Sequence, residues 1–194
     1  MANKVKYGLS NVYYAVLTET INPQTGDVTE TYGTPVAIKG AVNLSLNQSG
    51  EQTAFRADNL DYFVTYSNNG YEGDFECALI PDSFLTDVMG YALDQNEVLY
   101  EVNNAVPKAF ALLFQFEGDE KARRHVLYNC KASRPRVASQ TTDTTITPVT
   151  ETLSIKASAR LSDGVVKAST KLDDTTSAQY TGWFSSVYTP VTTS

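Results

Sequence analysis

The sequence predicts a single, mainly β domain over residues 1–194, with a β-sandwich or barrel-like fold, one short flanking helix and a long projecting loop. Three observations support this prediction. Short segments rich in aromatic and β-branched residues recur along the chain, turn-forming clusters separate them, and one segment has the spacing of a short amphipathic helix. With 42% hydrophobic residues, the chain has enough apolar surface to form a core.

The strands are predicted from alternating or continuous apolar residues. Residues 41–46 alternate, with Val42, Leu44 and Leu46 on the apolar face. Residues 109–116 are nearly continuous in apolar residues, which fits a strand buried on both faces or a helix segment, and large side chains at every second position favour the strand. In chain order, strands are expected at residues 11–19, 28–32, 41–46, 60–67, 73–80, 98–102, 109–116, 122–130 and 149–161.

Turn chemistry predicts how some of these strands are connected. The cluster at residues 21–27 predicts a hairpin between the first two strands. Residues 68–70, Asn-Asn-Gly, predict a second hairpin that joins 60–67 to 73–80, because Asn and Gly tolerate a positive φ.

The remaining segments are polar or have mixed composition. Residues 47–59 contain Phe55 as their one large apolar side chain, so we expect a long loop or a projecting arm there. Residues 139–147 are rich in Thr and are expected to form a loop or an exposed edge ribbon. The last segment, 180–191, has several aromatic residues and is expected to be tied to the body.

Residues 81–90 predict the short helix. Pro81 suits a first helical turn, Asp82 places a favourable charge near the helix dipole, and Gly90 suits a C-terminal cap. An apolar stripe on this helix is typical of a helix that covers one edge of a sheet. The stripe consists of Phe84, Leu85, Val88 and Met89.

The chain has few side chains suited to catalysis or metal binding. Its single histidine, His125, has no serine or cysteine placed by sequence as a nucleophile, so a structural or surface role is expected. Cys77 and Cys130 are expected to be free buried thiols, with a single disulfide as the alternative. We therefore expect no catalytic residue, no cofactor and no metal, and the protein is not expected to be an enzyme.

Two carboxylate pairs are the nearest approach to a cation site. Asp58 with Asp61, and Asp173 with Asp174, lack the Asp-x-Asp-x-Asp-Gly spacing that a hard cation requires. We expect these carboxylates to cap turns.

The charge balance disfavours a surface that grips nucleic acid, because 15 Lys and Arg face 22 Asp and Glu, giving a net charge of −7. The sequence has no apolar stretch long enough for a membrane span and no apolar run of signal-peptide length at its start, so neither is expected. Acidic residues between 58 and 87 precede a basic cluster at 121–136. This distribution of charge fits complementary patches in a head-to-tail contact between subunits. It equally fits charged faces that are exposed to solvent.

Several blocks of sequence, taken in order, resemble the major tail tube proteins of long-tailed, non-contractile phages of Gram-positive bacteria. The likeness covers nearly the whole chain, and the combination is more specific than any one block. The blocks are residues 5–15, 55–59 with Tyr62-Phe63, 67–74, 78–84 and 116–119.

This resemblance implies a β-sandwich subunit that forms hexameric rings, which stack into a hollow tube in the virion. The genome passes through the lumen without specific binding, and an acidic inner wall would let DNA slide. Implied partners are further copies of the chain, with tape measure, tail-terminator and initiator proteins. The subunit would be made in the bacterial cytoplasm, and the immunoglobulin-like C-terminal domain of some family members is not expected here.

If the resemblance holds, residues 47–59 form an arm that reaches the adjacent ring, and residues 81–90 form the flanking helix. Contacts between subunits or rings are then expected at Gln48, Glu51, Thr53, Phe55, Arg56, Asp58, Asn59, Asp61, Glu72, Asp74, Arg123 and Arg124. The alternative is a carbohydrate- or surface-binding β-sandwich, in which Trp183, Tyr180 and Tyr188 form a sugar-stacking platform.

Overall fold

The computed structural model describes residues 5–118, 122–141, 148–171 and 175–191. The predicted mainly β fold is confirmed, with 45% strand and 6% helix. The strands are β1 (Leu9–Ile21), β2 (Val28–Tyr32), β3 (Val36–Ala37), β4 (Ala41–Gln48), β5 (Gln52–Ala57), β6 (Leu60–Tyr66), β7 (Tyr71–Cys77), β8 (Ala92–Leu93), β9 (Leu99–Tyr100), β10 (Phe110–Phe116), β11 (Arg124–Ala132), β12 (Glu151–Ala157) and β13 (Lys167–Ser169). The helices are α1 (Asp82–Asp87) and α2 (Ala178–Thr181).

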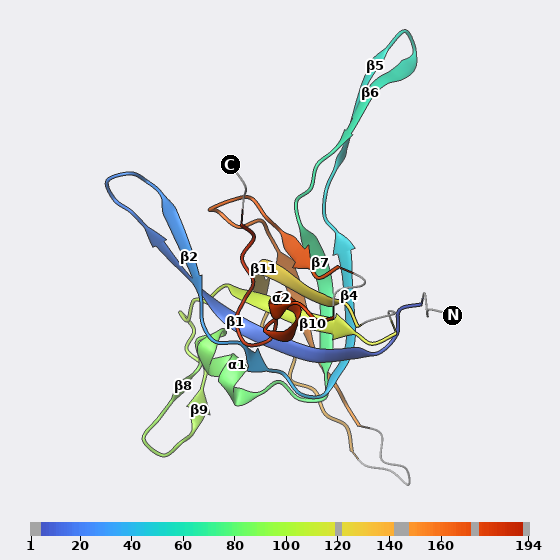
Figure 1. Ribbon diagram of the computed structural model, residues 1–194. Helices are drawn as coiled ribbons and strands as arrows, with labels where there is room; N and C mark the ends of the chain where they lie inside the picture. Colours follow the sequence, from blue (N-terminus) through green and yellow to red (C-terminus); the bar gives the residue numbers. More distant parts are fainter. Residues whose placement is uncertain (1–4, 119–121, 142–147, 172–174, 192–194) are drawn as a thin grey trace.

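One large antiparallel sheet forms the body, with the strand order β2-β1-β10-β11-β12-β7-β4 (Figure 1). The same edge of β11 pairs with two strands, with β13 at His125–Leu127 and with β12 at Cys130–Ala132. Strands β12, β7 and β4 continue the sheet from the second of these sites. Side chains from β1, β7, β10, β11 and β12 meet in one core, so the sheet curves around it.

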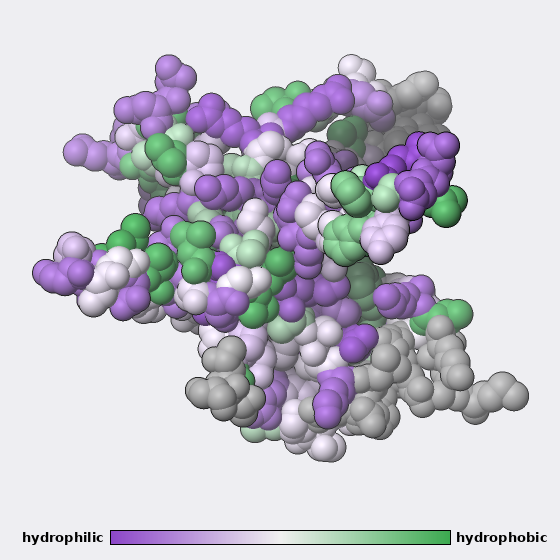
Figure 2. All heavy atoms as spheres, turned by 90° about the horizontal axis from the view of Figure 1, so that it is seen from above, coloured by the Kyte–Doolittle hydropathy of each residue, from purple (hydrophilic) through white to green (hydrophobic). Residues whose placement is uncertain are grey.

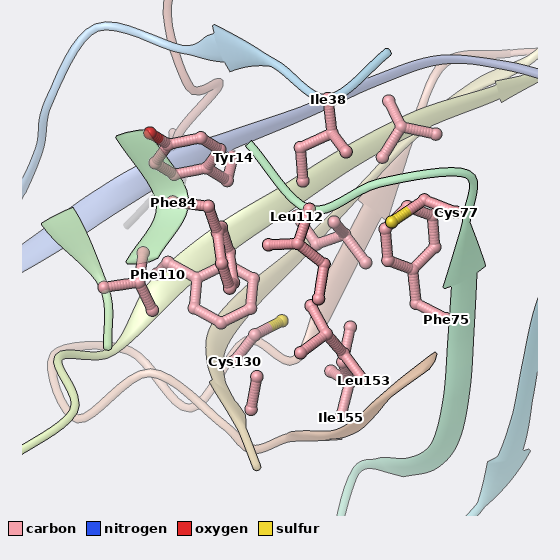
Figure 3. Packing of buried hydrophobic residues seen from close by; sticks show 14 of the residues in the cluster. Tyr14, Ile38, Phe75, Cys77, Phe84, Phe110, Leu112, Cys130, Leu153 and Ile155 are labelled. Carbon is pink, nitrogen blue, oxygen red and sulfur yellow. The ribbon is translucent and has the colours of Figure 1, made fainter. Parts of the chain in front are cut away.

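The first core lies between this curved sheet and α1 (Figure 3). Phe84 of α1 makes edge-to-face contacts with Tyr14 and Phe110, with ring centroids 5.1 and 5.3 Å apart. The predicted helix is confirmed but is shorter than 81–90. Pro81 is its N-cap residue and Gly90 follows with a φ of 78°.

The second core lies on the opposite face of β1, β10 and β11. Ala111 and Leu113 of β10 are buried there, together with Trp183 of the C-terminal segment. Strand β10 is therefore covered on both faces, as its nearly continuous apolar sequence predicts. The C-terminal segment is held by the body, as expected, but it also contains α2, a second helix that the sequence analysis missed.

Residues 47–59 do not form a loop. They complete β4 and form β5, which pairs with β6 in a two-stranded ribbon. The predicted hairpin at residues 68–70 is wrong, because β6 pairs with β5 and β7 pairs with β4 and β12. The expected projection is confirmed: the ribbon extends away from the sheet (Figure 1).

Smaller differences concern strand ends and registers. Residues 98–102 contribute only β9, and the strand expected at 149–161 ends at Ala157. A register shift lies between Ala41 and Asn43, so Val42 is exposed, contrary to its predicted place on the apolar face. The expected loop at 139–147 and the pair Asp173 and Asp174 lie wholly or partly outside the described residues.

Candidate functional site

The projecting ribbon, residues 49–69, is the most distinctive surface feature of the described chain and is called the arm below. Its turn is formed by Asp58 and Asn59, whose φ values are 53° and 63°. Two consecutive positive φ values are the conformation of a type I′ turn, which matches the twist of antiparallel strands. The arm is therefore a regular hairpin that extends the chain away from the body.

The register of the arm places bulky apolar side chains on both of its faces. Phe55 is paired with Phe63 on one face, and Val64 and Tyr66 lie on the other. An antiparallel ribbon with one face in water normally alternates apolar and polar residues. Strand β6 therefore has the pattern of a strand that is covered on both faces.

The arm has almost no cover from its own chain. Every residue of β6 is exposed, and its Tyr62 is 77% exposed. Phe55 and Phe63 are also exposed. Contiguous apolar surface of this kind marks an interaction site.

The base of the arm is held firmly. The Ser49 N–H donates to the carbonyl oxygen of Gly70 over 2.9 Å, and the Asn69 N–H donates to the carbonyl oxygen of Ser49 over 2.8 Å. Gly70 has a φ of 96°, and a Cβ there would collide with the carbonyl oxygen of Ala157. The arm therefore leaves the sheet at a defined point.

The structure brings most of the predicted contact residues together in this arm. Arg56 and Asp61 form an exposed ion pair over 3.1 Å. Gln48 ends β4 just before the arm begins. The predicted contact residues that lie within the arm are Glu51, Thr53, Phe55, Arg56, Asp58, Asn59 and Asp61.

Two further predicted residues lie on β7, which begins where the arm ends. Glu72 is exposed and lies between Asn47 of β4 and Lys156 of β12. Asp74 is exposed and accepts a hydrogen bond of 2.7 Å from the Ser154 hydroxyl. These carboxylates form an acidic strip below the base of the arm.

The two predicted arginines lie in another part of the fold. The Arg123 Nε donates to the carbonyl oxygen of Thr170 over 2.8 Å. The Arg124 guanidinium lies 3.8 Å from the ring centroid of Tyr180 and donates to the Gln115 side chain. Arg123 thus holds the end of β13, and Arg124 fixes the C-terminal segment to the sheet. Their role between subunits stays a prediction.

One buried charged network was not predicted from the sequence. Arg160 pairs with Glu30 over 3.0 Å and with Asp163 over 3.1 Å, and the Glu30 side chain is 0% exposed. The strand expected at 149–161 ends before Arg160. Nothing in the local sequence pattern signals a pair whose members are 130 residues apart.

Burial alone would raise the pKa of the Glu30 carboxyl. Hydrogen bonds from the Ser162 hydroxyl, the Leu161 N–H and the Arg160 guanidinium outweigh this effect and lower the pKa. Glu30 is therefore held as a carboxylate, and the network ties β2 to the segment that follows β12.

The described residues contain no group of three or more His, Cys, Asp or Glu side chains placed to hold a metal ion. His125 is buried and stacks on Phe114 with a centroid distance of 5.1 Å, which gives it a structural role. Cys77 and Cys130 are free and buried, as expected. Burial raises the pKa of Cys77 to about 11 and that of Cys130 to about 12, so both stay as thiols at neutral pH.

No helix in the described part of the chain is both long and apolar enough to span a membrane. A scan against protein-family models finds no match, and a search of curated proteins finds none either.

Proposed function

We propose that this chain is a structural virion protein that self-assembles into stacked hexameric rings, forming the phage tail tube through which the genome is delivered. The sequence resemblance described above supplies the family. The observation that carries the proposal is the arm, whose two apolar faces are exposed in the single chain. Such a ribbon is suited to burial between copies of the same subunit.

The exposed apolar surface of the arm limits the free energy that one contact between subunits contributes. Burying one large apolar side chain contributes about 1.5–3 kcal/mol. The arm exposes six of them, Phe55, Leu60, Tyr62, Phe63, Val64 and Tyr66. One docked arm thus contributes roughly 9–18 kcal/mol, against an association cost of about 4–15 kcal/mol. A closed ring, in which each subunit makes several contacts, exceeds this cost more easily than a single pair does.

The edges of the sheet offer a further means of assembly. Strands β2 and β4 end the strand order, and an exposed edge strand can pair with a strand of another chain. In a ring, such edges are used for contacts between neighbouring subunits. This use removes the aggregation hazard that a free edge carries.

The charge of the chain suits a conduit for DNA. A net charge of −7 disfavours binding to phosphates, and acidic groups on the inner wall would let the duplex slide. In this proposal the tape measure, tail-terminator and initiator proteins are the other partners of the tube.

The alternative function as a carbohydrate-binding module has less support. Trp183, its main stacking residue, is only 3% exposed, and its indole stacks on Tyr188. Tyr180 is half-buried against the Arg124 guanidinium. A sugar-stacking platform requires exposed rings, and these rings are buried or half-buried. On the face viewed from above, hydrophobic residues are dispersed among hydrophilic ones (Figure 2).

Removal of the arm tests the proposal. Residues 52–66 are replaced by Asn-Gly, which leaves every strand of the large sheet in place. Wild-type protein is expected to form rings or tubes in electron microscopy and to sediment as large particles. The shortened protein is expected to remain a folded monomer by circular dichroism and sedimentation.

Val106→Ser is the matched control, because Val106 is exposed and lies outside the arm. It is expected to assemble like wild type. Tubes of normal length from the shortened protein would refute the role of the arm, and a wild-type protein that stays monomeric at all concentrations would refute the proposal.

A further inference from the structure

The body contains a groove of about 220 Å³ near the base of the arm. This volume is below the roughly 300–1,000 Å³ of pockets that hold drug-sized ligands, so the groove is suited to one or two side chains. Apolar and aromatic residues line it together with two lysines. Its lining includes Leu44, Leu46, Tyr71, Phe116, Lys6 and Lys167.

The two lysines give the groove a positive rim. The Lys6 Nζ lies 6.0 Å from the ring centroid of Phe116, and the Lys167 Nζ donates to the Tyr71 hydroxyl over 3.0 Å. None of the residues that line the groove in the described part of the chain is acidic. The groove therefore combines an apolar surface with two lysines at its rim.

The tip of the arm has the complementary character. Leu60 and Tyr62 are its exposed apolar side chains, and Asp58 is a carboxylate next to the Arg56–Asp61 ion pair. Across residues 49–69, three acidic residues and one arginine give a net charge of 1 − 3 = −2. An acidic, apolar tip matches a basic, apolar groove.

The tip cannot reach the groove of its own chain. Leu46 and Tyr71, which line the groove, lie within three residues of the arm's base. The six residues of β5 alone separate the tip from that base by about 20 Å, because a strand rises about 3.3 Å per residue. The arm also points away from the body (Figure 1). Contact between tip and groove therefore requires two copies.

We infer that the groove receives the arm tip of a second copy of this chain. Leu60 and Tyr62 pack against the apolar lining, and Asp58 faces the two lysines. The contact uses different surfaces on the two copies, so it is head-to-tail and can repeat into rings or filaments. This inference rests on the proposed function and adds the receiving surface to it.

Disulfide trapping between two variants tests this contact. One full-length copy carries Leu60→Cys and the other carries Leu46→Cys, while the native cysteines are buried. Under mild oxidation the mixture is expected to yield a covalent pair of chains on non-reducing gels. The yield is expected to exceed that of a control mixture of Leu60→Cys and Val106→Cys by about tenfold, since a disulfide forms only when the two Cα atoms approach closely.

Charge reversal provides an independent measurement. Lys167→Glu is expected to raise the concentration needed for assembly by about tenfold, because it places like charges at the contact. Adding Asp58→Lys to the same chain is expected to restore most of the loss, whereas Asp58→Lys alone weakens assembly. Two losses that simply add would contradict a direct contact.

The outcomes separate this inference from the proposed function. Rings or tubes without the specific cross-link, and with unchanged assembly in Lys167→Glu, would refute the groove and leave the tube proposal standing. Cross-linked chains that form no rings or tubes would support the groove and refute the tube. Monomers without a specific cross-link would refute both.

Discussion

Strand β10 and the arm have a similar sequence signature and opposite environments. Both place large apolar side chains on both faces of a strand. Residues 110–115 of β10 are all buried, whereas every residue of β6 is exposed. The difference lies in what covers them: α1 and the curved sheet cover one face of β10, and the C-terminal segment covers the other.

This comparison shows how a pattern in one chain can refer to an assembly. An apolar residue on a strand predicts that the residue becomes covered, but it does not tell which chain provides the cover. In β10 the cover comes from the same molecule. In the arm it is proposed to come from other copies.

The largest effect is expected when one phenylalanine of β10 and one of the arm are replaced in turn. Phe110→Ala removes a fully buried ring from the first core and is expected to lower the free energy of unfolding by about 3–5 kcal/mol. Phe63→Ala in the arm is expected to change that free energy by less than about 0.5 kcal/mol, while preventing assembly.

Urea unfolding of the monomer and sedimentation of the assembled protein measure the two effects. A large loss of monomer stability from Phe63→Ala would show that the arm is part of the core, contrary to the comparison.

A smaller effect is expected from the ion pairs of the two regions. The Glu30–Arg160 pair is buried, so Glu30→Gln is expected to cost about 3 kcal/mol of unfolding free energy. The neutral amide would pair more weakly than the carboxylate with the buried Arg160 guanidinium. The Arg56–Asp61 pair is exposed, so Asp61→Asn is expected to cost less than about 1 kcal/mol. Thermal unfolding of both variants measures the difference, and equal losses would contradict it.

The smallest effect is a dependence on pH. The pKa of Glu30 lies below its ordinary value of 4.5, so folding favours the carboxylate. The resulting stabilisation is present above this ordinary value and is lost as the pH falls through the folded-state pKa. The urea midpoint of wild type is therefore expected to fall more steeply below pH 4.5 than that of Glu30→Gln. Parallel curves would show that Glu30 contributes nothing to the acid response.

Local patterns predicted most of the longer strands and α1, but not β3, β5, β8 or β13. The period of two in β10 and the Pro81-to-Gly90 spacing around α1 depend on neighbours in sequence, and the structure confirms both elements. The prediction at residues 68–70 failed because Asn-Asn-Gly and Asp58-Asn59 both have turn chemistry. The choice between them depends on which strand β7 joins, which is a contact between distant segments.

The candidate site was predicted in part. The polar composition of residues 47–59 indicated a loop or a projecting arm, and residues 60–67 were expected to form a strand. That these segments form one ribbon depends on their pairing. The groove brings together residues from the start of the chain to β13, so no sequence window contains it.

The fixed base of the arm has a consequence for the speed of assembly. Backbone hydrogen bonds at Ser49 and Asn69, with the close approach at Gly70, set the direction of the arm before any partner arrives. A preorganised hairpin loses less conformational entropy on binding than a flexible loop of equal length. Encounters between subunits can then lead to docking without a preceding folding step, so association is limited by diffusion and orientation.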